Sequence, residues 1–158
     1  MIIPTSEQRL AARQQPDSPV VMKQDWSHLL FLHWEIDPDV VQATLPPGLQ
    51  VDTHDGKAYM WVVPFHMDNV LPTYCPAVPG ISWFLELNLR TYVHDENGVP
   101  GVWFYCLDCN QWLAVKIARG LFHLPYQHAS MESYQHDGTL TYISRRKGCE
   151  QSQIFRYP

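Results

Sequence analysis

The stretch from Ile81 to Val93 alternates regularly between two sets of side chains. Successive side chains of a β-strand point to opposite sides of the sheet, so this pattern predicts one long strand with two different faces. One face is largely apolar and is expected to face a core; it comprises Ile81, Trp83, Leu85, Leu87, Leu89, Thr91 and Val93. The other face has a carboxylate, an amide and a guanidinium group between aromatic side chains; it comprises Ser82, Phe84, Glu86, Asn88, Arg90 and Tyr92. A chain with this strand requires a sheet that is apolar on at least one side.

The polar row of this strand has two interpretations. In a purely structural role, Glu86, Asn88 and Arg90 would be solvated on a sheet surface, or Glu86 and Arg90 would form an ion pair that holds a barrel wall. Inside a barrel, the same row would be the wall of a polar pocket. There Arg90 would bind a substrate carboxylate through its planar fork, and Glu86 would act as a general acid or base with a pKa raised by apolar surroundings. Asn88 would orient the substrate or Glu86, and the sequence leaves both interpretations open.

The composition is that of one globular domain rich in apolar side chains. Of the 158 residues, 46% are hydrophobic and 17% are charged, against about 25% charged residues in typical domains. A chain of this length is expected to form a single domain over residues 1–158. The scarcity of charge indicates a large interior or an interface between copies, so a homo-oligomer is one expectation. The 13 prolines argue for many loops and against a helical bundle.

Charge and hydropathy argue against two classes of partner. The formal net charge is -5, and the longest basic run is Arg145–Lys147, so the chain lacks the basic stripe that nucleic-acid binding requires. No apolar run approaches the roughly 18 residues of a membrane span. The N-terminal residues include Glu7 and Arg9 and lack the apolar segment of a secretory signal. We therefore expect a cytoplasmic protein that binds neither nucleic acid nor a membrane.

We expect a polar lead-in over residues 1–25, followed by a strand-rich domain over residues 26–158. Helices are predicted over residues 7–15, 38–44 and 111–122, and Asp37 and Pro38 are suited to begin the second of them. Strands are predicted over residues 26–35, 49–53, 57–67, 81–93, 101–107, 130–136, 139–145 and 151–157. Turn signals at Asp55-Gly56, Asn97-Gly98 and Asp137-Gly138 predict hairpins. The fold class that follows is α+β: a mostly antiparallel β-sheet curled toward a barrel, with a few short helices outside.

The third predicted helix has Asp108 or Asn110 as its expected cap. Its apolar side chains fall on one broad face, which is expected to pack on the sheet. This face comprises Leu113, Ala114, Ile117, Ala118, Leu121 and Phe122.

Several phrases along the chain together resemble a known family. They are Leu45-Pro-Pro-Gly-Leu49, Val63-Pro-Phe65, Glu86-Leu-Asn-Leu-Arg-Thr-Tyr-Val93, Gly98-Val-Pro-Gly-Val-Trp-Phe104 and Ala118-Arg-Gly-Leu-Phe-His-Leu-Pro-Tyr126. In this order, between Trp26 and Met131, they resemble the YqjF-like family of uncharacterised bacterial proteins. That family is similar in fold to acetoacetate decarboxylase.

The resemblance implies an acetoacetate-decarboxylase-like barrel with helices outside and the Glu86 strand facing a cavity. In the decarboxylases a strand glutamate works beside a Schiff-base lysine, and Glu86 stands where that glutamate falls. Tyr126 and Gln127 stand in place of the lysines of the family phrase. Because Schiff-base chemistry needs an activated amine, acetoacetate decarboxylase activity is not expected. The family normally continues further, so the chain is expected to lack the C-terminal elements of the family.

The histidines and cysteines give weaker signals. His33 and Glu35 share one strand face and His66 could lie nearby, but a metal site needs three or four converging ligands, usually at a short spacing, and no such spacing is present. We therefore predict no metal and no cofactor. Cys106-Leu-Asp-Cys109 is a C-x-x-C motif just before a helix. It lacks the βαβ context of a redox motif, so incidental thiols are favoured over a redox or zinc site, and the role of Cys106 and Cys109 stays open.

The resulting hypothesis is a cytoplasmic barrel protein that binds a small carboxylate-bearing organic molecule and, if it is an enzyme, transforms that molecule without a Schiff base. Glu86 is the candidate acid or base. The candidate substrate-binding residues are Arg90, Asn88, Tyr92, Phe84 and Tyr126. The alternative is a catalytically inactive interaction or scaffold protein that retains the decarboxylase-like fold. The sequence leaves open whether the chain is an enzyme.

Overall fold

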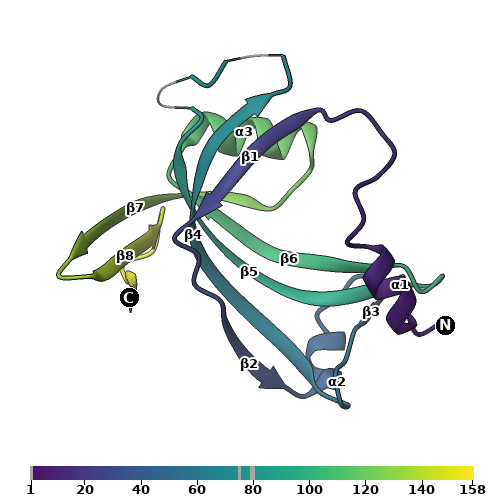
Figure 1. Cartoon of the computed structure of the whole chain (residues 1–158). Coiled ribbons are helices and arrows are strands. Elements are labelled where there is room, and N and C mark those ends of the chain that lie inside the picture. The colour runs from purple at the N-terminus through teal and green to yellow at the C-terminus, as the bar shows by residue number, and fades with distance from the viewer. Residues whose placement is uncertain (1, 75, 79–80) are drawn as a thin grey trace. The chain divides into compact units, whose positions relative to one another are not determined.

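The computed structural model describes residues 2–74, 76–78 and 81–158. Strands dominate the described residues, and three short helices accompany them (Figure 1). The helices are α1 (Ser6–Ala11), α2 (Pro38–Gln42) and α3 (Trp112–Leu121). The strands are β1 (Met22–Ser27), β2 (Leu32–Ile36), β3 (Leu49–Val51), β4 (Ala58–Pro72), β5 (Phe84–Asp95), β6 (Pro100–Cys109), β7 (Tyr126–His136), β8 (Thr139–Arg146) and β9 (Gln153–Tyr157).

The strands follow the order β1-β4-β5-β6-β7-β8-β9, with β2 also paired to β4 and β3 to β5. Strand β7 runs antiparallel to β8, and β8 to β9, whereas β6 and β7 are parallel over a short register that sets Leu107 beside Tyr126. A parallel pair needs a crossover connection, and α3 lies in that connection. The predicted α+β class with a mostly antiparallel sheet is confirmed. Among the described residues, no helix is both long and apolar enough to cross a membrane.

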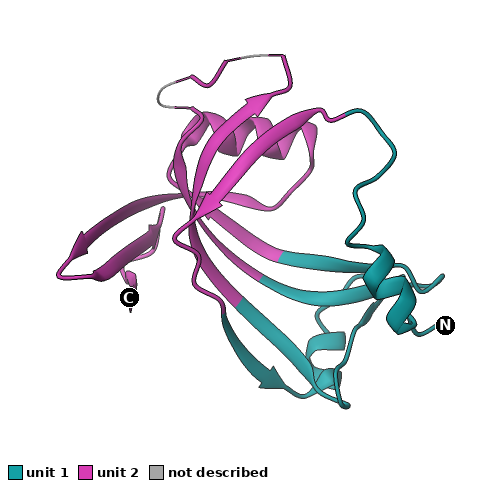
Figure 2. Cartoon of the chain, in the orientation of Figure 1, with its two compact units in different colours: residues 1–19, 32–61, 90–104 teal, residues 20–31, 62–89, 105–158 magenta. Residues whose placement is uncertain are grey.

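The chain divides into two compact units (Figure 2). Unit 1 comprises residues 1–19, 32–61 and 90–104, and unit 2 comprises residues 20–31, 62–89 and 105–158.

Unit 1 contains α1, α2, β2 and β3. The α1 helix begins with a capping box, in which the side chains of Thr5 and Gln8 each bond the backbone N–H of the other. The α2 helix begins as predicted, because the Asp37 side chain accepts from a backbone N–H of the first turn and Pro38 follows it. Val41 on α2 is buried and anchors this helix. The unit therefore owes its helical segments to local capping and to one apolar anchor.

Unit 2 contains the main apolar cluster of the structure. Its buried members are Leu87, Ala129, Met131 and Tyr142, and Val62, Leu85, Phe155 and Tyr157 pack against them. The β7–β8 hairpin supplies three of the four buried members, Ala129, Met131 and Tyr142. It turns at Asp137 and Gly138, with φ angles of 48° and 75°, which fits the predicted Asp-Gly turn. The core of this unit thus includes Leu85 and Leu87, near the start of β5.

Two strand predictions differ from the structure in their continuity or partner strand, beyond shifts of their ends. The predicted strand over 26–35 is divided into β1 and β2, and His28 between them has a φ of 50°, which no regular strand allows. The turn at Asp55 and Gly56 forms, but β3 pairs with β5 instead of forming a hairpin with β4. The reason is that the pairing of β3 with β5 continues beyond Val51, where the Asp52 N–H donates to the Tyr92 carbonyl.

The α3 helix also differs from its prediction at both its cap and its face. Gln111 caps it, because Asp108 pairs with Arg146 and the Asn110 side chain accepts from the Leu85 N–H. On the expected apolar face, Ile117, Leu121 and Phe122 are exposed. Val115, which lies outside that face, is the buried residue of α3. Fewer apolar side chains of α3 are buried than its sequence pattern predicts.

Candidate functional site

A buried hydrogen bond in unit 2 joins two side chains that the sequence singles out. Glu86 lies on β5, and Tyr126 is the first residue of β7, held there by its parallel register with Leu107. The Tyr126 hydroxyl donates to Glu86 Oε2 over 2.7 Å. Glu86 is 3% exposed and Tyr126 is 9% exposed. A carboxyl group and a phenol therefore meet away from bulk water.

Burial controls the protonation of this pair. Loss of hydration disfavours the ionised carboxylate and raises the pKa of Glu86 to about 7, although hydrogen bonds from Tyr126 and Asn88 lower it in part. Burial and the nearby Glu86 carboxylate also raise the pKa of Tyr126, so the phenol keeps its proton. Near neutral pH, Glu86 can accept or release a proton while Tyr126 remains a hydrogen-bond donor.

Two further residues of unit 2, Tyr142 and Cys109, interact with Glu86. The Tyr142 hydroxyl donates to the backbone carbonyls of Glu86, over 2.8 Å, and of Phe65, over 3.2 Å, and so fixes the backbone of β5 at Glu86. Burial raises the pKa of the Cys109 thiol to about 12, and the negative charge of Glu86 adds to this effect. The sequence signals for both residues are weak. Tyr142 stands in an alternating strand pattern like any core residue, and Cys109 is distinguished only by its C-x-x-C spacing.

The other predicted site residues do not all belong to the same unit. Asn88 is 3% exposed in unit 2, and its Oδ1 atom has no hydrogen-bond partner among the described residues. Phe84, at the start of β5, is half-buried in the same unit. Arg90 is half-buried and Tyr92 is exposed, and both belong to unit 1. The residues that the structure brings together are therefore Glu86, Asn88 and Tyr126.

No lysine of the chain is buried. Lys23, Lys57, Lys116 and Lys147 are all exposed. Lys57 pairs with Glu35, and Lys116 lies over the Trp112 ring. Desolvation is one of the two ways to make an amine nucleophilic at neutral pH, and it is not available to these lysines.

The histidines with the strongest metal-site pattern have other contacts. His33 stacks on Trp61 with ring centroids 4.6 Å apart, and His66 Nε2 lies 2.8 Å from the Ser133 hydroxyl. Burial lowers the pKa of His66. Within residues 2–74, 76–78 and 81–158, no group of three His, Cys, Asp or Glu side chains is placed to hold a metal ion. Cys75 lies outside these residues.

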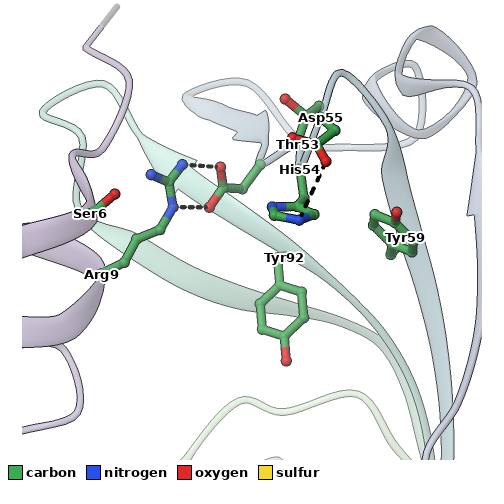
Figure 3. Close-up of a pocket in the computed structure, with 8 residues that line it drawn as sticks. Ser6, Arg9, Thr53, His54, Asp55, Tyr59 and Tyr92 are labelled. Carbon is green, nitrogen blue, oxygen red and sulfur yellow. Dashed lines mark hydrogen bonds and ion pairs between the residues drawn. The ribbon is translucent and has the colours of Figure 1, made fainter.

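A pocket of about 380 Å³ lies in unit 1 (Figure 3). It is lined by side chains from α1, from the turn before β4, from β4 and from β5. Tyr92 is the predicted site residue that lines it, and Glu86 does not.

The fold is similar to that of acetoacetate decarboxylases, of whose chains it covers about half. An acetoacetate decarboxylase from Legionella pneumophila superposes with a TM-score of 0.59 at 16% identity, over 80% of this chain and 44% of that one. An acetoacetate decarboxylase-like enzyme from Sphingomonas wittichii gives a TM-score of 0.60 at 18% identity, over 83% of this chain and 55% of the other. The enduracididine biosynthesis enzyme MppR, complexed with pyruvate, gives a TM-score of 0.59 at 16% identity, over 86% and 55%.

The chain belongs to the DUF2071 family, described as "uncharacterized conserved protein", whose profile matches residues 23–157. It is 42% identical to the uncharacterized protein YqjF of Bacillus subtilis over 132 residues, which are 84% of this chain and 54% of that protein. The predicted resemblance and the decarboxylase-like fold are confirmed. The chain spans about half the length of the curated relative that it matches.

Proposed function

We propose that this protein binds a small carboxylate-bearing organic molecule at Glu86, Asn88 and Tyr126, and that Glu86 exchanges a proton with it. The observation that supports this proposal most strongly is the 2.7 Å hydrogen bond between two buried side chains, Tyr126 and Glu86. A core that needed only stability would gain more from two apolar side chains at these positions than from a buried acid and a phenol.

Glu86 suits proton transfer because its pKa of about 7 lies at the working pH of most enzymes. Below this pKa it is a neutral acid, which can lie beside a ligand carboxylate without repulsion. Tyr126 would hold the Glu86 carboxyl group in place through its hydroxyl. The unpartnered Asn88 Oδ1 offers a further acceptor for a ligand hydroxyl. The chemistry needs no Schiff base, in keeping with the exposed lysines.

The comparisons support a small organic acid as the ligand. The structural relatives include an enzyme named for acetoacetate and one that was crystallised with pyruvate. These molecules are small keto acids, and we extend their chemical class to this chain on the strength of the shared fold. The role of Arg90 as a clamp for the carboxylate stays a prediction, as do those of Tyr92 and Phe84. A cytoplasmic location also stays a prediction.

A thermal-shift screen tests the proposal. Small keto acids, hydroxy acids and aromatic acids would be added to the wild-type protein and to Glu86→Gln, which keeps the shape of the side chain and removes its titration. The matched control is Glu132→Gln, because Glu132 is an exposed glutamate of the same unit. A ligand that binds only the folded protein raises the melting temperature.

We expect at least one acid to raise the melting temperatures of the wild type and of Glu132→Gln by the same amount. The same acid should shift the melting temperature of Glu86→Gln by a different amount. The wild-type shift should shrink as the pH rises through about 7, because ionised Glu86 repels a carboxylate. An equal shift in all three proteins at every pH would show that the acid binds elsewhere. No shift with any acid would leave the proposal without a ligand and would contradict it.

The second candidate function is that of an interaction protein that kept the fold. The observation that favours it is the exposure of Ile117, Leu121 and Phe122 on the apolar face of α3, where Leu121 is 72% exposed. This candidate includes a homo-oligomer that would cover the face. Light scattering coupled to size-exclusion chromatography tests it: the wild type should associate and Leu121→Glu should be monomeric. A monomeric wild type would speak against the homo-oligomer.

A further inference from the structure

We propose that the pocket of unit 1 is a second binding site, and that its ligand is a neutral, polyhydroxylated ring such as a monosaccharide or a cyclic polyol. Arg9, Asp52, His54, Tyr59 and Tyr92 are among the residues that line the pocket. Figure 3 shows Arg9 on α1, His54 on the turn before β4, and Tyr59 and Tyr92 on the strands. The proposal is independent of the acid–base site, because all of the lining residues belong to unit 1.

Part of the pocket lining is aromatic. Tyr59 and Tyr92 line it, and two further rings connect them: His33 lies edge-on to Tyr59 at 5.8 Å and is stacked on Trp61 at 4.6 Å. Trp61 in turn meets Tyr92 edge-on at 5.7 Å. Ring contacts of this kind hold each other in place. Yet Tyr92 remains 40% exposed, so part of a fixed aromatic surface stays open to a ligand. The C–H faces of a sugar ring are apolar and pack on such surfaces.

The remaining lining residues of the pocket offer hydrogen bonds. Arg9 donates two hydrogen bonds to Asp52, from Nε to Oδ2 over 3.0 Å and from Nη2 to Oδ1 over 2.6 Å. The hydroxyls of Ser6 and Thr53 and the ring of His54 lie on the same pocket. Hydroxyls both donate and accept, the carboxylate accepts, and the guanidinium donates. A ligand hydroxyl needs this mixture, because it also donates and accepts.

The charges of the pocket argue for a neutral ligand. Arg9 and Asp52 neutralise each other through their two bonds, and Asp55 adds a negative charge 3.7 Å from the His54 ring. Without an unpaired positive group, the pocket is poorly suited to a carboxylate or phosphate. An organic cation is disfavoured because Asp52 is already bonded by Arg9 and Asp55 is largely exposed. The volume of about 380 Å³ lies at the small end of ligand pockets, roughly 300–1,000 Å³, and suits a single ring.

Saturation-transfer NMR with the full chain tests this proposal. Glucose, galactose and myo-inositol would be the probes, each at millimolar concentration, with pyruvate as an acid comparison. The test variants are Tyr92→Ala, which removes an aromatic wall, and Thr53→Val, which removes one hydroxyl at constant shape. The matched control is Tyr134→Ala, because Tyr134 is an exposed tyrosine of unit 2.

We expect at least one polyol to show saturable binding to the wild type and to Tyr134→Ala. Tyr92→Ala should bind about tenfold more weakly, because it loses both the aromatic contact and the apolar area that the ring buries against the ligand. Thr53→Val should bind several-fold more weakly, and this comparison holds even if Tyr92→Ala fails to fold. Glu86→Gln should leave polyol binding unchanged, which separates this proposal from that for the acid–base site.

Three results would overturn the proposal. They are the absence of saturable binding by any polyol, equal binding by the wild type and Thr53→Val, and pyruvate displacing the polyol from the wild type. The last result would show that the unit 1 pocket takes acids. None of these results would depend on whether an acid binds at Glu86.

Discussion

Replacing Glu86 by glutamine should stabilise the protein at alkaline pH and remove a pH dependence of its stability. In the folded wild type the pKa of Glu86 is raised from 4.5 to about 7, mainly by burial. Below pH 4.5 the carboxyl group is neutral in both the folded and the unfolded chain, so it adds no pH dependence. Between 4.5 and about 7 the unfolded chain releases the proton while the folded chain retains it. Stability therefore falls as the pH rises through this window and levels off above it.

The magnitude follows from the two pKa values. Each pH unit between them lowers the free energy of unfolding by about 1.4 kcal/mol, so the full loss is about 3 kcal/mol. Glu86→Gln does not titrate and should show none of this loss. Its amide can still accept from Tyr126, and the unpartnered Asn88 Oδ1 can receive its N–H. A constant difference in stability is therefore expected to be small beside the pH-dependent one.

The assay is urea unfolding of both proteins at several pH values from 4 to 9. The quantity of interest is the difference in unfolding free energy between them, because the other titrating groups contribute equally to both and cancel. We expect this difference to grow by about 3 kcal/mol in favour of Glu86→Gln as the pH rises. A difference that stays constant across this range would refute the reasoning, because it would mean that burial does not raise the pKa of Glu86.

Tyr126→Phe is the matched control for this experiment. The Tyr126 hydrogen bond lowers the pKa of Glu86, so its removal should raise that pKa further. The window in which stability falls should therefore extend to higher pH in Tyr126→Phe than in the wild type. A window unchanged by this substitution would mean that the hydroxyl does not act on the carboxylate.

Three other substitutions or reactions give separate predictions. Tyr142→Phe should lower the unfolding free energy by about 1–2 kcal/mol in urea unfolding, because two buried carbonyls lose their donor. Arg146→Ala should lower the unfolding free energy by about 2 kcal/mol in the same measurement, because it leaves the buried Asp108 carboxylate unpaired. The loss should be smaller than for a fully buried pair, because Arg146 is partly exposed. Iodoacetamide at pH 8 should modify the exposed Cys149 and spare Cys109, whose thiol is buried with a pKa of about 12, and mass spectrometry of peptides would show both sites. Losses below about 0.5 kcal/mol, or rapid alkylation of Cys109, would contradict these predictions.

Local sequence patterns predicted much of the fold. The alternation from Ile81 to Val93 predicted the strand β5, which begins at Phe84, and the Asp137-Gly138 signal marks the β7–β8 turn. These features depend on near neighbours, which the sequence displays directly. The pairing of β3 with β5 depends instead on a choice between two possible partner strands. Asp108 and Asn110 both stood at positions suited to cap α3. Neither caps it, because Asp108 pairs with Arg146 and the Asn110 side chain accepts from the Leu85 N–H.

The candidate site was predicted residue by residue but not as an arrangement. The polar row of β5 would look the same on a wet surface and in an interior, so the burial of Glu86 and Asn88 could not be derived from alternation alone. The contact of Glu86 with Tyr126 joins residues 40 positions apart in the sequence and arises from the parallel register of β6 and β7, which the sequence does not encode locally. Tyr142 was missed because nothing distinguishes a strand tyrosine that bonds a backbone carbonyl from one that only packs.

The most direct test of the acid–base site is the pKa of Glu86 itself. Selective carbon-13 labelling of glutamate and an NMR titration of the carboxyl resonance would measure it, with Glu86→Gln used to assign the signal. The proposed site predicts a pKa near 7 in the wild type and a higher value in Tyr126→Phe. A wild-type pKa near 4.5 would mean that Glu86 is an ordinary ionised carboxylate at neutral pH, and would contradict its role as a proton carrier.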